Sequence, residues 1–243
     1  MPPSDPPPTL FATTRWTLVI DAARGAETAA VDALGELVRT YWQPLYRYAR
    51  RKGKSKEDAE DLVQGFMLHL IEARSLDSAD RDKGRFRAFL LACFNHWMTN
   101  EWRHATRQKR GGGQTVLSFD WQSAETGLRL DPPDERSPDH HFDREWALAL
   151  LAKVLDDLEA ASRAEGSIEQ FERLKSCLTA DSRKIPYAQI ASELGVTEGA
   201  LRVAVHRLRK RYRTLLTAEI TRTLASPDSV EDEMKALFAA LSA

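Results

Sequence analysis

The most informative chemical groups in this sequence are basic side chains near the C-terminus. Six basic residues and no acid lie between Arg202 and Arg213. Arginine can donate paired hydrogen bonds to the edge of guanine, and glutamate can accept one from cytosine. A helix that starts after Thr197 would expose such groups along one face. The residues on that face predicted to contact DNA bases or phosphates are Thr197, Glu198, Arg202, His206, Arg207 and Lys210.

Two short helices must position this basic face. The first is predicted from the apolar spacing of Tyr187, Ile190, Ala191 and Leu194. Gly195 follows, where a left-handed backbone is easy only for glycine. Val196 is expected to fill the corner, and Thr197 is a helix N-cap. The pattern is typical of a helix-turn-helix, whose second helix enters the major groove of DNA. The alternative is a helical hairpin with a solvated basic face.

Groups suited to catalysis or metal binding are sparse. Among six histidines and two cysteines, no helical histidine pair with a glutamate and no cysteine at ligand spacing occurs. The glycines at 111–113 follow a predicted helix rather than a strand, so they do not indicate a nucleotide site. We therefore expect no enzyme activity, no catalytic residue, no cofactor and no metal.

The net charge of −1 hides a segregation of charge along the 243 residues. The stretch 47–56 holds six basic residues and no acid, whereas 120–145 holds eight acids and three arginines. A near-neutral total therefore does not exclude a basic surface that binds nucleic acid. The sequence has no apolar run long enough to span a bilayer and no signal-peptide pattern, so we expect a cytoplasmic protein with no membrane partner.

Helical apolar spacing recurs along the chain without a convincing strand pattern, so the predicted fold is all-α. We expect two helical bundles joined by an acidic linker, the second containing the helix-turn-helix. The predicted parts are an N-terminal extension at 1–24, partly disordered, a first bundle at 25–110, a linker at 111–141, a second bundle at 142–216 and an amphipathic C-terminal extension at 217–243. Pro44 is expected to kink or split the helix that contains it.

A short acidic run in the first bundle adds a specific signal. Asp58-Ala59-Glu60-Asp61-Leu62-Val63-Gln64 resembles the sigma-factor segment that docks on the clamp helices of the largest RNA polymerase subunit. An acidic face of this kind suits a basic partner. The resemblance implies polymerase-binding roles for Asp58, Glu60, Asp61 and Gln64. On its own, the run is also compatible with an ordinary helix that has acids near its N-terminus.

The stretch from 84 to 110 resembles the sigma-factor segment that melts and reads the minus-ten promoter element. It begins Gly84-Arg85-Phe86-Arg87-Ala88-Phe89-Leu90. Opening DNA requires a surface that holds an unstacked base and follows a single strand. Asn95 matches the family position that lines the pocket for a flipped base. The DNA-contacting residues predicted for this helix are Arg85, Arg87, Asn95, Asn100, Arg103 and Arg107, and the aromatic residues expected in its core are Phe86, Phe89, Phe94 and Trp97.

Together these segments resemble the sigma-70 family, of the extracytoplasmic-function (ECF) type with N- and C-terminal extensions. The resemblance covers about 31–110 and 142–216. It implies a transcription initiation factor that binds core RNA polymerase and promoter DNA, both duplex and melted strand, with an anti-sigma protein as a further candidate partner. The linker would then imitate nucleic acid inside the polymerase, or serve as a solubilising tether.

Two alternatives stay open at the level of sequence. The chain could be a stand-alone helix-turn-helix regulator that binds duplex DNA without polymerase, although such a regulator has no use for the docking segment. The C-terminal extension could pack against the DNA-reading bundle or a partner, or it could simply be a stabilising helix. Its apolar positions are Met234, Leu237, Phe238 and Leu241.

Overall fold

The computed structural model describes residues 28–72, 86–105, 119–130, 137–181, 183–224 and 230–242. Every element in these ranges is a helix, which confirms the predicted all-α class for the described part of the chain. The α-helices are α2 (Thr28–Arg51), α3 (Lys56–Glu72), α4 (Phe86–Ala105), α5 (Trp121–Leu130), α6 (Pro138–Ala164), α7 (Ile168–Leu174), α8 (Tyr187–Leu194), α9 (Glu198–Arg222) and α10 (Val230–Ser242). A short 3-10 helix, η3 (Lys175–Cys177), follows α7. The predicted N-terminal extension lies outside the described residues.

Local sequence signals account for several helix ends. The N–H of Asp58 donates a hydrogen bond of 3.0 Å to Ser55 Oγ, as expected of an N-cap. Ser137 caps α6 in the same way, and Pro138 occupies its first turn, where a missing N–H costs nothing. Pro44 does not split α2, which continues from Thr28 to Arg51.

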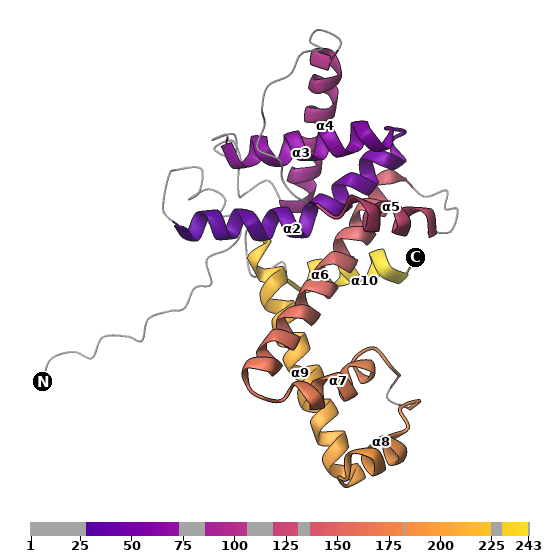
Figure 1. The fold of residues 1–243 in the computed structure, drawn as a ribbon. Coiled ribbons are helices and arrows are strands. Elements are labelled where there is room, and N and C mark those ends of the chain that lie inside the picture. The colour runs from indigo at the N-terminus through magenta and orange to yellow at the C-terminus, as the bar shows by residue number, and fades with distance from the viewer. Residues whose placement is uncertain are drawn as a thin grey trace, which may run out of the picture.

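Helices α2, α3 and α4 pack around a core rich in aromatic residues (Figure 1). Phe86 and Phe94 of α4 are fully buried, as predicted, whereas Phe89 and Trp97 are only partly buried. The ring centroids of Phe66 and Phe94 lie 5.1 Å apart in a tilted pair. This core fixes the exposed faces of α3 and α4 relative to each other.

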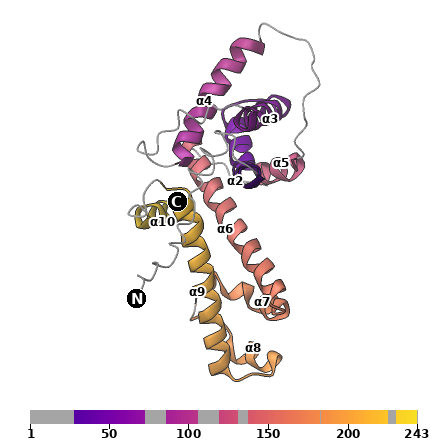
Figure 2. The same cartoon turned by 90° about the vertical axis from the view of Figure 1, so that its left-hand side faces the viewer.

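Helix α6 connects this bundle to the other end of the molecule (Figures 1 and 2). Its N-terminal half adds Phe142, Trp146 and Leu150 to the first core, which Leu216 of α9 and Leu237 of α10 also join. A separate small core lies at the far end of α6 and α9. Its buried residues are Leu174, Cys177, Ile185, Tyr187, Ala191, Leu201 and Val205. The predicted boundary at 216 therefore falls within α9.

Helix α5 lies inside the stretch predicted to be a linker, and it packs against α2. Glu125 is only 8% exposed. It accepts hydrogen bonds from the Tyr46 hydroxyl at 2.8 Å and from Arg50 Nη2 at 3.0 Å. Trp121 makes an edge contact with Trp42 of α2, with centroids 5.3 Å apart. Part of the expected linker is thus a docked helix whose acid neutralises a basic residue of the first bundle.

The Tyr46–Glu125 contact predicts a dependence of stability on alkaline pH. Burial, and then the hydrogen bond to Glu125, raises the pKa of Tyr46 above its ordinary value. A tyrosine whose pKa is higher in the folded state than in the unfolded state adds to the free energy of unfolding. That contribution is complete below about pH 10 and is lost as the pH rises toward the folded-state pKa. Between about pH 10 and 11, we expect urea unfolding to show a steeper loss of stability for the wild type than for Tyr46→Phe, by up to about 1.4 kcal/mol per pH unit.

The other tyrosines with raised pKa values, Tyr48 and Tyr212, are present in both proteins and cancel in this comparison. Identical pH slopes for wild type and Tyr46→Phe would contradict the assigned contact.

Candidate functional site

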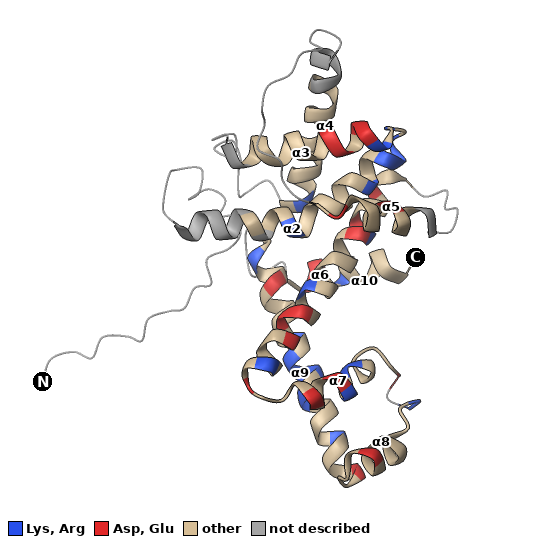
Figure 3. Ribbon diagram, viewed as in Figure 1, with Lys and Arg blue, Asp and Glu red and all other residues tan. Residues whose placement is uncertain are grey.

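The acidic face predicted on α3 is present at the surface. Asp58 and Asp61 are exposed, and Glu60 and Gln64 are partly exposed. The opposite side of the helix supplies Ala59, Val63 and Phe66 to the core. Figure 3 shows the acidic residues gathered in the first half of α3. Glu60 and Gln64 are four residues apart, and Asp58, Asp61 and Gln64 follow one another at intervals of three, so these side chains lie on the same side of the helix. Lys56 Nζ approaches Glu60 at 3.8 Å.

The predicted DNA residues of α4 fall into three groups. Arg85 and Arg107 lie outside the described residues, and only the backbone of Arg103 is described. Asn100 is partly exposed, with its Nδ2 2.8 Å from His96 Nε2. The remaining two, Arg87 and Asn95, face other parts of the same chain.

Arg87 is buried, contrary to the expectation of a solvent-facing side chain. It is 5% exposed. Its Nε donates a hydrogen bond of 2.8 Å to Asp143 Oδ1 of α6, and it forms an ion pair with Glu233 of α10. The guanidinium also lies over the ring of Trp146, 4.4 Å from its centroid. The physical reason for the difference is that α6 and α10 pack over the first turn of α4.

Asn95 lies partly buried beside the start of α6. The Tyr48 hydroxyl is 3.0 Å from both Asn95 Oδ1 and Asp139 Oδ1. A hydroxyl has one hydrogen, so it can donate to only one of them at a time. Burial is the first cause of the raised pKa of Tyr48, so this hydroxyl stays protonated as a donor.

The turn between α8 and α9 has the geometry that the sequence predicts. Gly195 adopts a left-handed φ of 65°, and Thr197 Oγ1 accepts a hydrogen bond of 3.2 Å from the N–H of Ala200. Leu201 and Ala191 are buried between the helices. Val196 differs from the prediction, because it is 45% exposed rather than filling the corner.

The N-terminal half of α9 exposes the predicted basic face. Its exposed members are Glu198, Arg202, His206, Arg207 and Lys210. Arg202 is held on two sides. Glu198 Oε1 accepts hydrogen bonds from its Nη2 at 2.6 Å and its Nε at 3.1 Å. The Tyr187 ring lies 4.2 Å below the guanidinium. Glu198 thus occupies the edge of the guanidinium formed by Nε and Nη2, and none of the hydrogen bonds described for Arg202 uses Nη1.

Two comparisons with known proteins bear on the family of this chain. Residues 37–108, which hold most of α2 and all described parts of α3 and α4, match the family model for Sigma-70 region 2. The chain is also 26% identical over 210 residues to the ECF RNA polymerase sigma factor SigE of Mycolicibacterium smegmatis, covering 86% of this chain and 71% of that protein. These two matches support an ECF sigma factor of the sigma-70 family. No solved structure matches this chain.

Arg209 of the sigma factor has a different position from its neighbours on α9. It belongs to the basic run at 202–213, but its Nε and Nη2 donate to the Cys177 carbonyl at 3.0 and 2.6 Å. Its Nη2 also donates to the Ala180 carbonyl at 2.6 Å. Arg209 therefore ties the segment after α7 to α9 and positions the two-helix unit. The sequence could not distinguish it from a phosphate-binding arginine, because its partners are backbone carbonyls.

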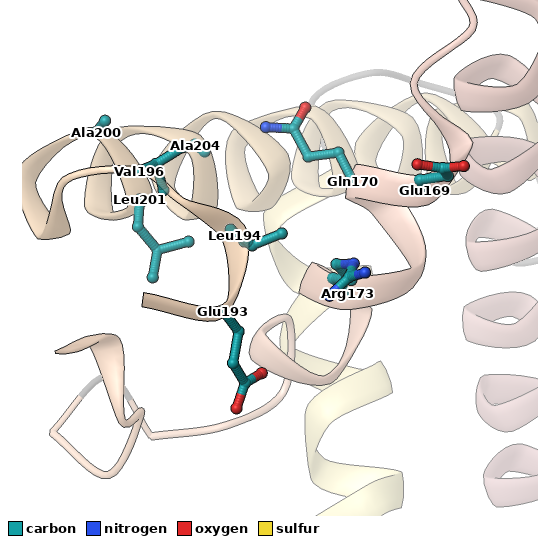
Figure 4. Close-up of a pocket in the computed structure, with 9 residues that line it drawn as sticks. All are labelled: Glu169, Gln170, Arg173, Glu193, Leu194, Val196, Ala200, Leu201 and Ala204. Carbon is teal, nitrogen blue, oxygen red and sulfur yellow. The ribbon is translucent and has the colours of Figure 1, made fainter. Parts of the chain in front are cut away.

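The sigma factor also has a surface pocket of about 450 Å³ between α7, α8 and the start of α9 (Figure 4). Its walls combine charged residues of α7 and α8 with small apolar residues of α9. Ala200 and Ala204 line it. They stand on a different side of α9 from Arg202 and His206, because a spacing of two residues turns the helix by more than half a circle. The pocket is therefore separate from the basic face.

Two further features bear on the type of partner. None of the helices in the described ranges combines the length and apolar character that a membrane span needs. Among the same residues, no three His, Cys, Asp or Glu side chains come together as a metal site requires. Sigma factors in general are not enzymes, and the exposed chemistry found in this one is charge and hydrogen bonding.

Proposed function

We propose that this sigma factor initiates transcription by bringing core RNA polymerase to promoter DNA and helping to open it. In this proposal α3 docks on the clamp helices of the largest subunit, α4 captures an unstacked base, and α9 binds upstream duplex. The supporting observation is the exposed acidic face of α3, fixed by a shared core beside α4 within the stretch that matches Sigma-70 region 2.

The distribution of charge supports separate roles for the two ends of the molecule. Asp58 and Asp61 offer carboxylates to a basic protein partner, and electrostatic complementarity of this kind favours correct docking. Arg202 and Arg207 on α9 offer donors to bases and phosphates. We also infer that the protein works in the cytoplasm, where the polymerase is, and that an anti-sigma protein is a further partner.

Run-off transcription from a pool of promoter fragments tests the proposal. Core RNA polymerase is assayed with and without the sigma factor, and RNA is expected only when both are present. Sequencing the active fragments then gives the promoter elements. The stand-alone regulator predicts the opposite result, which is no RNA but tight, sequence-specific duplex binding by the protein alone.

Asn95→Ala is expected to lower run-off RNA from duplex promoters by about 10- to 100-fold, because a paired amide contact to a base is worth roughly 1–3 kcal/mol. The loss should shrink on templates in which the minus-ten region is already unpaired. The assay compares both templates at equal occupancy of polymerase.

Thr126→Ala serves as the control, because this exposed threonine of α5 bonds only to the Gln122 carbonyl of its own helix among the contacts described. Wild-type RNA yields from Asn95→Ala on duplex templates would remove Asn95 from the base pocket.

A further inference from the structure

The side of α4 that carries Arg87 and Asn95 is covered by the second half of the chain. Arg87, Leu91 and Asn95 recur every four residues, so they share one stripe of the helix. In Figure 2 the start of α4 lies beside the start of α6 and close to α10. At its N-terminal end this candidate DNA stripe therefore packs against protein, with Arg87 buried and Leu91 and Asn95 partly buried.

Helix α6 presents a matching acidic stripe. Asp139 and Asp143 are also four residues apart, so they lie on one side of α6. Asp139 shares the Tyr48 hydroxyl with Asn95, and Asp143 accepts a hydrogen bond from Arg87. The two stripes run in opposite directions, with one carboxylate beside each of the two predicted DNA-contacting residues.

The C-terminal helix closes the contact. Glu233 of α10 is 2% exposed and forms an ion pair with Arg87. Leu237, one helical turn later, is buried in the large core. Apolar packing thus holds α10 in place while its acid reaches α4. Burying charge is costly unless each group keeps a partner, so such pairs specify an arrangement more than they stabilise it.

We propose that the free sigma factor masks its own DNA stripe, with Asp139, Asp143 and Glu233 standing in for nucleic-acid phosphates and α10 acting as the latch. This inference rests on the proposed function. Asp143 and Glu233 both pair with the Arg87 guanidinium, and Asp139 lies across the Tyr48 hydroxyl from Asn95. The closed stripe therefore repels phosphates as well as excluding them sterically. Binding of core polymerase, which separates the two halves, releases the stripe for melted DNA.

Weakening the latch tests this proposal in the full-length protein without polymerase. The probe is a fluorescent single strand carrying the minus-ten region of a fragment active in run-off transcription. Glu233→Gln is expected to bind it about tenfold more tightly than the wild type, since coupling between a closed and an open state typically changes affinity by such factors. Faster hydrogen exchange across 230–242 should accompany the gain.

Asp232→Asn is the matched control, because it removes the same charge one residue earlier on α10. The Asp232 side chain is 72% exposed and pairs only with Lys235 of its own helix among the ion pairs described. Asp143→Asn tests the mask from α6, where the side chain is 43% exposed and folding is less at risk. Thermal unfolding establishes that each variant is folded.

Tighter binding by Glu233→Gln and Asp143→Asn, with no change in Asp232→Asn, supports the mask if adding Asn95→Ala removes the gain. A gain that survives Asn95→Ala overturns it, because the released surface is then not this stripe. Wild-type affinity in folded Glu233→Gln and Asp143→Asn overturns it as well. If Glu233→Gln does not fold, Asp143→Asn alone decides.

The proposed function fails by a different result, which is absence of RNA with wild-type protein and core polymerase. If the wild-type protein supports transcription but the variants bind the single strand no more tightly than the wild type, only the masking proposal is rejected and the proposed function stands.

Discussion

Asp61→Arg in α3 is expected to weaken binding of core RNA polymerase by at least about 100-fold, because a like charge placed against a complementary partner costs several kcal/mol. RNA synthesis should fall on every promoter, since docking precedes sequence recognition. Asp61 is exposed and contributes nothing to the core of the first bundle, so the variant is expected to fold normally. Fluorescence anisotropy of labelled sigma factor titrated with core enzyme measures the effect.

Asp156→Arg on α6 is the matched control. It makes the same charge reversal at an exposed aspartate far from α3 along the chain. The loss of affinity for core polymerase caused by Asp61→Arg should also become smaller as the salt concentration is raised, because screening weakens both the native attraction and the introduced repulsion. Wild-type affinity of Asp61→Arg for core polymerase would mean that α3 is not the docking surface.

The parts of this molecule that the sequence predicted well are those set by local signals. Apolar residues that recur at helical spacing predicted α3, α4 and the pair α8 and α9. Gly195 and Thr197 occupy the turn and capping positions expected of them. The exposed faces of α3 and α9 follow directly, because each face is the side opposite a buried stripe of the same helix.

Features that depend on distant partners were not predictable in this way. The acids of 120–145 look like a solvated linker in the sequence, yet Glu125 is buried against Tyr46, 79 residues earlier in the chain. Arg87 and Arg209 look like exposed basic residues, but carboxylates and backbone carbonyls from other helices bind them. Periodicity says which side of a helix is polar. It does not say whether water, protein or DNA satisfies that polarity.

The continuity of α6 illustrates the same limit. Its buried residues Phe142, Trp146 and Leu150 give the periodicity of any amphipathic helix. Only the fold reveals that they pack in the first core. The bundle that carries α4 therefore shares one apolar interior with α6, α9 and α10. The arrangement of the candidate site therefore depends on this tertiary contact more than on any single motif.

Arg202→Ala is expected to weaken binding of upstream promoter duplex by about 10- to 100-fold on fragments with the preferred guanine, because a bidentate arginine–guanine pair is worth roughly 1–3 kcal/mol. On fragments without that guanine, affinity should change little. Binding is measured with polymerase holoenzyme on fragments taken from the active pool. Arg213→Ala is the control, because an exposed arginine three turns later is expected to lower affinity equally on all sequences and to reduce the salt slope by about one unit.

We expect Tyr187 to influence how selective that contact is, since its ring supports the Arg202 guanidinium from one side while Glu198 holds one edge. A side chain fixed in advance loses less rotamer freedom on binding, so Tyr187→Leu should weaken binding without contacting DNA itself. Replacing the guanine by 7-deazaguanine removes the N7 acceptor. The wild type should lose more affinity from that replacement than Tyr187→Leu does, because the two changes act on the same hydrogen bonds. Equal losses would separate Tyr187 from base reading and leave it as a core residue of the two-helix unit.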